Sequence, residues 1–169
     1  MNRERSGRLR IAQIGYGYWG PNLARNFYQL PDAELALVVD ANAESLTRVR
    51  ALYACHTAPA VDDALGDPSI QAVAIATPAR THFALAQRAL LAGKHVFVEK
   101  PLAMSSAEAR TLVDLAAAQR RVLMVGHVFE YNPAVRYIKG IIEAGELGEI
   151  YYLYSRRVNL GRVQSDVNA

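Results

Sequence analysis

Short apolar runs alternate with segments of helical periodicity along most of the chain, and this alternation limits the fold more than any other feature. The runs are apolar on both faces, as strands of a parallel sheet covered by helices on both sides must be. The helical segments carry apolar residues three or four positions apart, for example Val135, Ile138 and Ile142. Six strands separated by helices predict an α/β fold built on a doubly wound parallel sheet. The predicted strands occupy residues 9–14, 35–39, 72–76, 95–98 and 122–125, with a weaker strand–helix unit at 56–65.

A glycine-rich loop follows the first predicted strand, where residues 15–20 read Gly-Tyr-Gly-Tyr-Trp-Gly and match the pattern G-x-G-x-x-G. In this setting Gly15 permits a tight turn, Gly17 lets the backbone approach a diphosphate, and Gly20 lets helix and strand pack closely. The start of the following helix offers unpaired N–H groups and a partial positive charge to phosphates. We therefore predict a dinucleotide site of the Rossmann type. The alternative is a glycine-rich turn in an α/β domain that binds no nucleotide.

An aspartate ends the second predicted strand, and Asp40 follows Gly20 at the spacing typical of such sites. A carboxylate there accepts hydrogen bonds from both hydroxyls of the adenine ribose and repels the 2′-phosphate of NADP. The next residues, Ala41 and Asn42, include no arginine that would bind this phosphate. The predicted cofactor is therefore NAD rather than NADP. The alternative is an aspartate that caps the following helix without a ligand.

Composition limits the size of the protein and its partners. The 169 residues are 51% hydrophobic and 21% charged, which suffices for one full domain with a buried core. The net charge of +3 is scattered along the chain, so we expect no nucleic-acid partner. No apolar run reaches the roughly 18 residues that cross a membrane, and no signal-peptide core follows the basic N-terminus, so we expect a cytoplasmic protein without membrane contact. A lone cysteine, Cys55, excludes an internal disulfide, and the histidines lack metal-ligand spacing, so no metal site is predicted.

The alternating pattern ends near Gly145 to Gly148, which we interpret as a domain boundary. Residues 149–158 read EIYYLYSRRV and predict a long strand with apolar side chains on both faces. Only eleven residues follow this strand, too few to cover it. We therefore predict a Rossmann domain at residues 1–146 and, at residues 147–169, the truncated start of a second α/β domain.

The fifth predicted strand ends in Glu99-Lys100-Pro101. In an open α/β sheet, the carboxyl ends of the strands border the ligand crevice, so Lys100 is placed to meet the reactive end of a cofactor. Partial burial would let this lysine exchange a proton with a substrate hydroxyl. The alternative is an ordinary surface lysine before a turn proline.

Two further motifs add to this pattern. One is Ala-Thr-Pro at 76–78 with His82 four residues later, and the other is Ala-Gly-Lys-His-Val at 92–96, which leads into Glu99-Lys100-Pro101. Together with the glycine loop and Asp40, they resemble the Gfo/Idh/MocA family, which includes glucose–fructose oxidoreductase and inositol dehydrogenase. The resemblance implies a Rossmann domain followed by a larger domain with an open antiparallel sheet. It also implies oxidation or reduction of a small sugar-like substrate, namely a sugar, cyclitol or nucleotide-sugar, with a nicotinamide cofactor.

Residue by residue, the resemblance assigns cofactor contacts along the carboxyl ends of the strands, and it makes Lys100 the catalytic lysine. Two histidines in this set have plainer alternatives, since His82 can be a surface helix residue and His127 a strand-end histidine with satisfied hydrogen bonds. The implied cofactor-binding residues are Gly15, Gly17, Tyr18, Trp19, Gly20, Asp40, Thr77, Pro78, His82, Glu99, Lys100 and His127.

Residues near the end of the chain are weaker candidates for substrate contact. The resemblance implies that Asn132 lies close to where nicotinamide and substrate meet, and it extends to Arg156, Arg157 and Asn159. The alternative for the arginine pair is a solvated surface patch.

One departure from the family pattern concerns acid–base chemistry. Members of the family supply a histidine from the second domain in a D-x-x-x-H pattern, whereas Asp166 is followed here by three residues without a histidine. The resemblance thus implies an NAD-dependent oxidoreductase in truncated form. The alternative is a non-catalytic NAD-binding module or fragment that forms a homo-oligomer through the exposed strand at 149–158.

Overall fold

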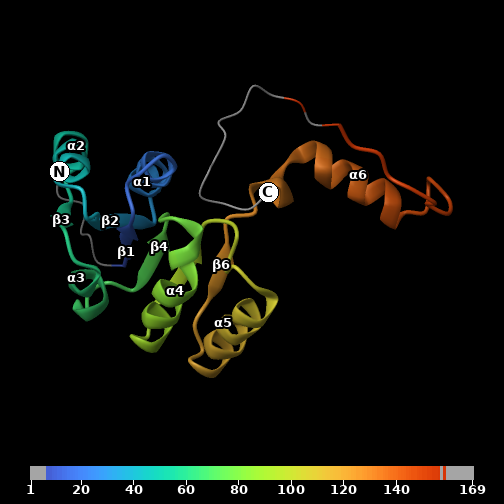
Figure 1. Cartoon of the computed structure of the whole chain (residues 1–169). Coiled ribbons are helices and arrows are strands. Elements are labelled where there is room, and N and C mark those ends of the chain that lie inside the picture. The colour runs from blue at the N-terminus through green and yellow to red at the C-terminus, as the bar shows by residue number, and fades with distance from the viewer. Residues whose placement is uncertain (1–6, 157, 159–169) are drawn as a thin grey trace. The chain divides into compact units, whose positions relative to one another are not determined.

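The computed structural model describes residues 7–156 and residue 158. Within this part of the chain, six strands form a sheet in the order β3-β2-β1-β4-β5-β6, and every neighbouring pair is parallel (Figure 1). The predicted α/β fold with a parallel sheet is confirmed. The strands are β1 (Leu9–Ile14), β2 (Ala33–Val39), β3 (His56–Ala58), β4 (Ala72–Ile75), β5 (His95–Val98) and β6 (Leu123–Val125).

Helices cover both faces of the sheet, so the winding is double as predicted. α1 (Gly20–Gln29) and α2 (Ala43–Leu52) lie against one face, whereas α3 (Val61–Gly66), α4 (His82–Leu91) and α5 (Ser106–Ala118) lie against the other (Figure 1). The other helical elements are the 3₁₀ turns η1 (Ala79–Thr81) and η2 (Val128–Tyr131) and the helix α6 (Pro133–Glu143).

Strand residues alternate between the two helical layers because successive side chains of a strand point to opposite faces. In β4, Val73 and Ile75 belong to the core cluster that includes Leu90 of α4, whereas Ala74 belongs to the cluster beneath Phe27 of α1. Burying one such Val or Ile side chain stabilises a fold by roughly 1.5–3 kcal/mol. Apolar residues on both faces of the strands therefore hold the two layers on one sheet.

Side-chain caps fix where α2 and α5 begin. Asn42 Oδ1 accepts a hydrogen bond from the backbone N–H of Glu44 at 2.9 Å and caps α2. Ser105 Oγ accepts from the backbone N–H of Glu108 at 3.2 Å and caps α5. Such caps satisfy N–H groups that have no partner inside the helix.

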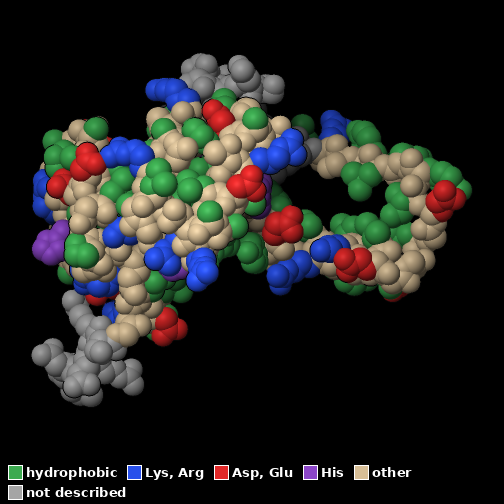
Figure 2. All heavy atoms as spheres, turned by 90° about the horizontal axis from the view of Figure 1, so that it is seen from below, with side chains coloured by type: hydrophobic (Ala, Val, Ile, Leu, Met, Phe, Trp, Pro, Cys, Tyr) green, Lys and Arg blue, Asp and Glu red, His purple; other side chains and the backbone are tan. Residues whose placement is uncertain are grey.

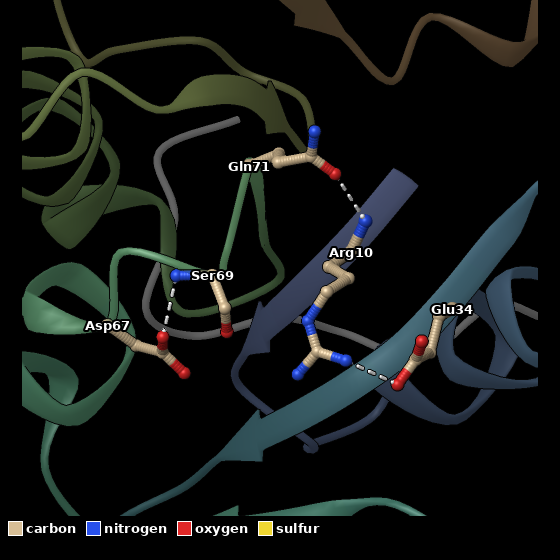
Figure 3. A network of polar contacts seen from close by, with 5 residues as sticks. All are labelled: Arg10, Glu34, Asp67, Ser69 and Gln71. Atoms are coloured by element: carbon tan, nitrogen blue, oxygen red, sulfur yellow. Dashed lines mark hydrogen bonds and ion pairs between the residues drawn. The ribbon is translucent and has the colours of Figure 1, made fainter. Parts of the chain in front are cut away.

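Polar contacts join the amino-terminal ends of β1 and β2 to the segment that enters β4 (Figure 3). Arg10 Nη1 forms an ion pair with Glu34 Oε1 at 2.7 Å, and the backbone N–H of Arg10 donates to Gln71 Oε1 at 3.0 Å. In the turn before β4, Asp67 Oδ1 accepts from the backbone N–H of Ser69 at 2.7 Å, and the hydrogen bonds from Ser69 lower the pKa of Asp67. Side-chain contacts thus link the neighbouring strands at the amino-terminal edge of the sheet. The loops at the opposite edge carry the predicted site residues.

The chain divides into two compact units, Met1–Gly126 and His127–Ala169. The first contains the sheet with α1 to α5, and the second contains η2 and α6, which contact each other. This division falls before α6, whereas the sequence places a boundary after it, at 146/147. The larger second domain expected from residue 147 onward stays a prediction.

The segment 149–158 differs from its prediction as a strand. Its described residues, 149–156 and 158, form neither helix nor strand. Tyr151, Tyr152, Leu153 and Tyr154 each expose more than three quarters of their surface, at 82%, 86%, 77% and 81%. A strand needs a neighbouring strand to pair its N–H and C=O groups, and apolar alternation alone does not provide one.

Charged side chains are mixed over the face of the molecule drawn in Figure 2. Lys and Arg lie among Asp and Glu there and form no continuous basic patch. This distribution agrees with the small net charge of +3. Within the described residues, no helix combines the length and the apolar character needed to cross a membrane.

Candidate functional site

The loops that follow β1, β4 and β5 leave the sheet side by side. The backbone N–H of Gly15 donates to Val39 O at 2.8 Å, that of Ala76 to Ile14 O at 2.8 Å, and that of Glu99 to Ile75 O at 2.9 Å. Each strand end is therefore hydrogen-bonded to the next one across the sheet. The order reverses at β1, between β2 and β4, which is the position where open α/β sheets bind ligands.

Two glycines of the loop are required by their own surroundings. Gly15 has a φ of +95°, and a Cβ there would lie 2.5 Å from Ala76 O. A Cβ on Gly20 would lie 2.6 Å from Gly15 O, so the start of α1 can approach the end of β1 only without a side chain. Both positions behave as the sequence predicts.

The third glycine faces open space. A Cβ on Gly17 would meet no atom within 4 Å, and Gly17 is exposed. Packing inside the protein therefore does not require glycine here, whereas close approach of a ligand to the backbone would. α1 begins beside this loop with Pro21 in its first turn and without a side-chain cap, so its first N–H groups can serve an anion.

A buried glutamine, absent from the sequence-based site, closes the glycine loop. Gln13 is 0% exposed, and its Nε2 donates to Gly15 O and to Gly20 O, each at 2.9 Å. One amide group thus ties the first and last glycines together. The only sequence signal was a polar residue inside the apolar strand Leu9–Ile14.

The glycine loop after β1 orients the side chain of Asp40, which follows the neighbouring strand β2. Its Oδ2 accepts from the backbone N–H of Tyr16 at 2.6 Å, and its Oδ1 accepts from the backbone N–H of Asn42 at 2.8 Å. The side chain is half-buried. A carboxylate oxygen has two lone pairs, so each Asp40 oxygen keeps one for a ligand hydroxyl.

The aromatic residues of the loop point in different directions. Tyr16 is 2% exposed and belongs to the core beneath α1 and α2. Burial is the largest cause that raises the pKa of Tyr16 to about 12, and the neighbouring Tyr53 raises it further. Tyr18 and Trp19 are 74% and 42% exposed, so their side chains lie on the outer surface of the loop. Tyr16 thus anchors the loop whose backbone the site would use.

The turn after β4 is held by its own hydroxyl groups and by His82. Thr77 Oγ1 and Thr81 Oγ1 lie 2.7 Å apart, and Thr81 Oγ1 donates to Pro78 O at 2.7 Å. His82 is 1% exposed, with Nε2 2.8 Å from Thr77 O and Nδ1 2.7 Å from Pro101 O. Its interpretation as a surface helix residue is therefore wrong, and neither ring nitrogen is left for a cofactor. Thr77 and Pro78 remain accessible at the edge of the sheet.

The turn after β5 presents an acid and a lysine. Glu99 Oε2 accepts from the backbone N–H of Lys100 at 3.3 Å, and its Oε1 is buried without a hydrogen-bond partner among the described residues. The carboxylate lies over Gly126, where a Cβ would be only 3.0 Å from Glu99 Oε1. Lys100 is exposed, because it lies in the turn beyond the end of β5. The Lys100–Pro101 peptide bond is cis.

The remaining candidates belong to the second unit. His127 is exposed at the start of η2, and Asn132 Oδ1 caps α6 by accepting from the backbone N–H of Ala134 at 2.9 Å. Arg156 is exposed. Arg157 and Asn159 lie outside the described residues.

No group of three or more potential metal ligands occurs among the residues that the structure describes. What the first unit does bring to one edge is a set of backbone N–H groups, two carboxylates and a lysine. The N–H groups suit phosphates, the carboxylates suit ribose hydroxyls, and the lysine suits proton exchange. This donor set fits a nicotinamide dinucleotide.

Comparisons with known proteins agree with this geometry. A family model described as "Oxidoreductase family, NAD-binding Rossmann fold", that of Gfo/Idh/MocA proteins, matches residues 9–127. The chain is 36% identical over 150 residues to UDP-N-acetylglucosamine 3-dehydrogenase from Acidithiobacillus ferrooxidans, covering 89% of this chain and 45% of that protein. It is 34% identical over 149 residues to scyllo-inositol 2-dehydrogenase (NAD(+)) from Bacillus subtilis, covering 85% of this chain and 43% of that protein.

A solved structure gives the same result for the fold. The crystal structure of myo-inositol 2-dehydrogenase from Lactobacillus plantarum superposes with a TM-score of 0.78 at 25% identity, covering 85% of this chain and 43% of that one. The chain therefore spans less than half the length of these relatives. By the match of the family model over residues 9–127, it belongs to the Gfo/Idh/MocA oxidoreductases and carries the NAD-binding Rossmann domain of that family.

Proposed function

We propose that this chain binds NAD(H) across the carboxyl edge of its sheet and forms the cofactor half of an oxidoreductase. The substrate class that we propose is a small molecule with ring hydroxyls, namely a sugar, cyclitol or nucleotide-sugar. The observation that carries the proposal is the combination at the first loop: open space at Gly17 beside a carboxylate, Asp40, that the loop itself orients.

The diphosphate belongs at Gly17 and the start of α1 in this proposal. A Cβ built on Gly17 would meet no atom within 4 Å, and α1 has no side-chain cap that would compete for its first N–H groups. Negative charge is also favoured at a helix N-terminus by the helix dipole. Gln13 keeps this backbone in place through its bonds to Gly15 O and Gly20 O.

Asp40 supports NAD over NADP. Its two oxygens each retain a lone pair for the hydroxyls of the adenine ribose, as described above. A phosphate on the same ribose would place negative charge against this carboxylate. The following residues, Ala41 and Asn42, supply no positive charge to offset that repulsion.

Lys100 is the residue that we assign to proton transfer. When bound, nicotinamide supplies the hydride acceptor or donor, and the protein orients it. Lys100 lies exposed beyond β5, and a cofactor and substrate bound over this turn would supply the partial burial that lets its amino group exchange a proton with a substrate hydroxyl. Glu99 fits a contact with a ligand donor, since its Oε1 is buried without a partner among the described residues and such groups are normally satisfied.

The names of the relatives support the substrate class. They describe dehydrogenases of UDP-N-acetylglucosamine and of scyllo-inositol, that is, of a nucleotide-sugar and a cyclitol. Both compounds have secondary hydroxyls on a six-membered ring. We extend this common chemistry to the protein of which this chain forms a part or the whole.

The test of cofactor binding substitutes Gly17, because the fold does not need glycine there. We expect Gly17→Ala to weaken NADH binding by about tenfold or more, since a methyl group would hold the diphosphate away from the backbone. Gly66→Ala is the matched control, because a Cβ at Gly66 also meets no atom within 4 Å. The measurement is a fluorescence titration with NADH, with thermal unfolding recorded for both variants.

Both variants should unfold near the temperature of the wild type, and Gly66→Ala should bind NADH as the wild type does. Equal NADH affinity in Gly17→Ala and wild type would show that no diphosphate approaches this loop.

A further inference from the structure

We propose that His82 is a positioning residue that fixes the turn after β4 to the turn after β5 and thereby shapes the nicotinamide half of the site. This inference rests on the proposed function, because it assigns the two turns to the cofactor. It changes the role of His82 from a cofactor contact to a link between the segments that would make the contacts.

The geometry of His82 excludes a surface role. The side chain is 1% exposed at the first residue of α4, a helix that contacts both β4 and β5. Its Nε2 lies 2.8 Å from Thr77 O and its Nδ1 lies 2.7 Å from Pro101 O. One ring therefore joins two turns that are 24 residues apart in sequence.

Both partners of the ring are carbonyl oxygens, which only accept hydrogen bonds. An imidazole ring carries at least one N–H, so His82 donates a hydrogen bond to at least one of these carbonyls. Both ring nitrogens lie within hydrogen-bond distance of a carbonyl oxygen, at 2.7 and 2.8 Å. His82 therefore bridges the two turns through its ring nitrogens.

The other hydrogen bonds within the turn after β4 do not involve His82. Thr81 Oγ1 donates to Pro78 O and contacts Thr77 Oγ1, and the backbone N–H of Thr81 also donates to Pro78 O at 2.9 Å. Local hydroxyl groups thus set the shape of this turn. His82 adds the connection to Pro101, next to Lys100, and so sets the distance between two turns that are each already formed.

The position of these turns along the sheet assigns them to the nicotinamide end. Asp40 follows β2 and would hold the adenine ribose, and the glycine loop follows β1 and would hold the diphosphate. Since β4 and β5 come next in the sheet, a dinucleotide extended in this direction reaches their turns with its second half. ADP lacks that half, which provides the test.

The experiment compares NADH with ADP as probes of the full chain. We expect the wild type to bind both, and His82→Leu to weaken NADH binding on the order of tenfold while leaving ADP binding unchanged. His82→Gln should recover part of the loss, because its amide nitrogen carries two N–H groups and can donate again. Equal weakening of NADH and ADP, or no change in either, would overturn the proposal.

His95→Leu is the matched control. His95 also bonds to backbone, because its Nδ1 accepts from the N–H of Val122 at 3.0 Å, but it lies at the amino-terminal end of β5. We expect this variant to bind NADH and ADP as the wild type does. Failure of the wild type to bind either probe would instead contradict the proposed function, so the two failures are distinguishable.

A measurement on the wild type covers the case in which His82→Leu does not fold. NMR of the histidine ring N–H groups measures how fast their protons exchange with water, and His82→Gln identifies the His82 resonances by their loss. We expect a slowly exchanging ring proton on His82, because the ring is buried and bonded to backbone. Exchange as fast as that of an exposed histidine would contradict the link between the two turns.

Discussion

At the scale of single residues, the candidate site depends on polar side chains that bind backbone. Asp40 accepts from Tyr16 N–H, Gln13 donates to two glycine carbonyls, and His82 contacts the carbonyls of two turns. The sequence predicted Asp40 from its spacing, because that spacing reflects the length of one strand–helix–strand unit. It could not predict Gln13 or the burial of His82, because side-chain identity does not reveal which carbonyl groups lie nearby.

Cys55 gives a prediction about pH at this scale. Burial raises the pKa of its thiol from 9.0 to about 11, so we expect slow reaction with a disulfide reagent at pH 8. Two pKa units reduce the thiolate fraction about 100-fold relative to the unfolded chain. Because the pKa of Cys55 is higher in the folded than in the unfolded state, the protonated thiol contributes to the stability of the fold. This contribution is complete below pH 9 and is lost as the pH rises from 9 to about 11.

The measurement compares thiol reaction rates in native buffer and in urea. Because Cys55 is the only cysteine of the chain, every reacted thiol reports on this position. Equal rates in the two solutions would contradict the burial of Cys55.

At the scale of elements, local pattern predicted most of the first unit. Strands β1 and β5 have the predicted bounds, and α2 and α5 begin after the side-chain caps Asn42 and Ser105. These features depend on residues that are close in sequence, so the local sequence pattern can predict them. The segment 149–158 depends on a partner strand, and there the alternation of apolar residues predicted a strand that the described residues do not form.

Gln13 gives the prediction at the element scale, since it closes the loop between β1 and α1. Gln13→Leu keeps the side-chain size but leaves Gly15 O and Gly20 O without these donors. We expect a loss of about 1–3 kcal/mol in the free energy of unfolding, the usual cost of unsatisfied buried polar groups. NADH affinity should fall as well, because the loop backbone would no longer be fixed.

Gln71→Leu is the control for this substitution. Gln71 Oε1 also accepts a hydrogen bond from backbone, the N–H of Arg10, but it does so at the opposite edge of the sheet (Figure 3). This variant should lose some stability and keep its NADH affinity. If Gln13→Leu also kept its NADH affinity, the loop would not depend on Gln13 for binding. Urea unfolding and NADH titration give the two quantities.

At the scale of the whole first unit, the two edges of the parallel sheet differ in what they offer. The amino-terminal edge is closed by Arg10, Glu34 and Gln71, whereas the carboxyl edge carries the glycine loop and the two strand-end turns. Every strand runs in the same direction, so one edge collects all the loops that follow strands. A dinucleotide laid along that edge would meet Asp40, the glycine loop and Lys100 in this order.

The most direct test of this arrangement is a paired titration with NADH and NADPH. We predict that the wild type binds NADH more tightly than NADPH by about tenfold or more, since Asp40 accepts from ribose hydroxyls and repels a phosphate there. Asp40→Asn should narrow this preference, whereas Lys100→Ala should bind NADH nearly as the wild type does. Tighter binding of NADPH by the wild type, or an unchanged preference in Asp40→Asn, would contradict the assignment of the adenine ribose to Asp40.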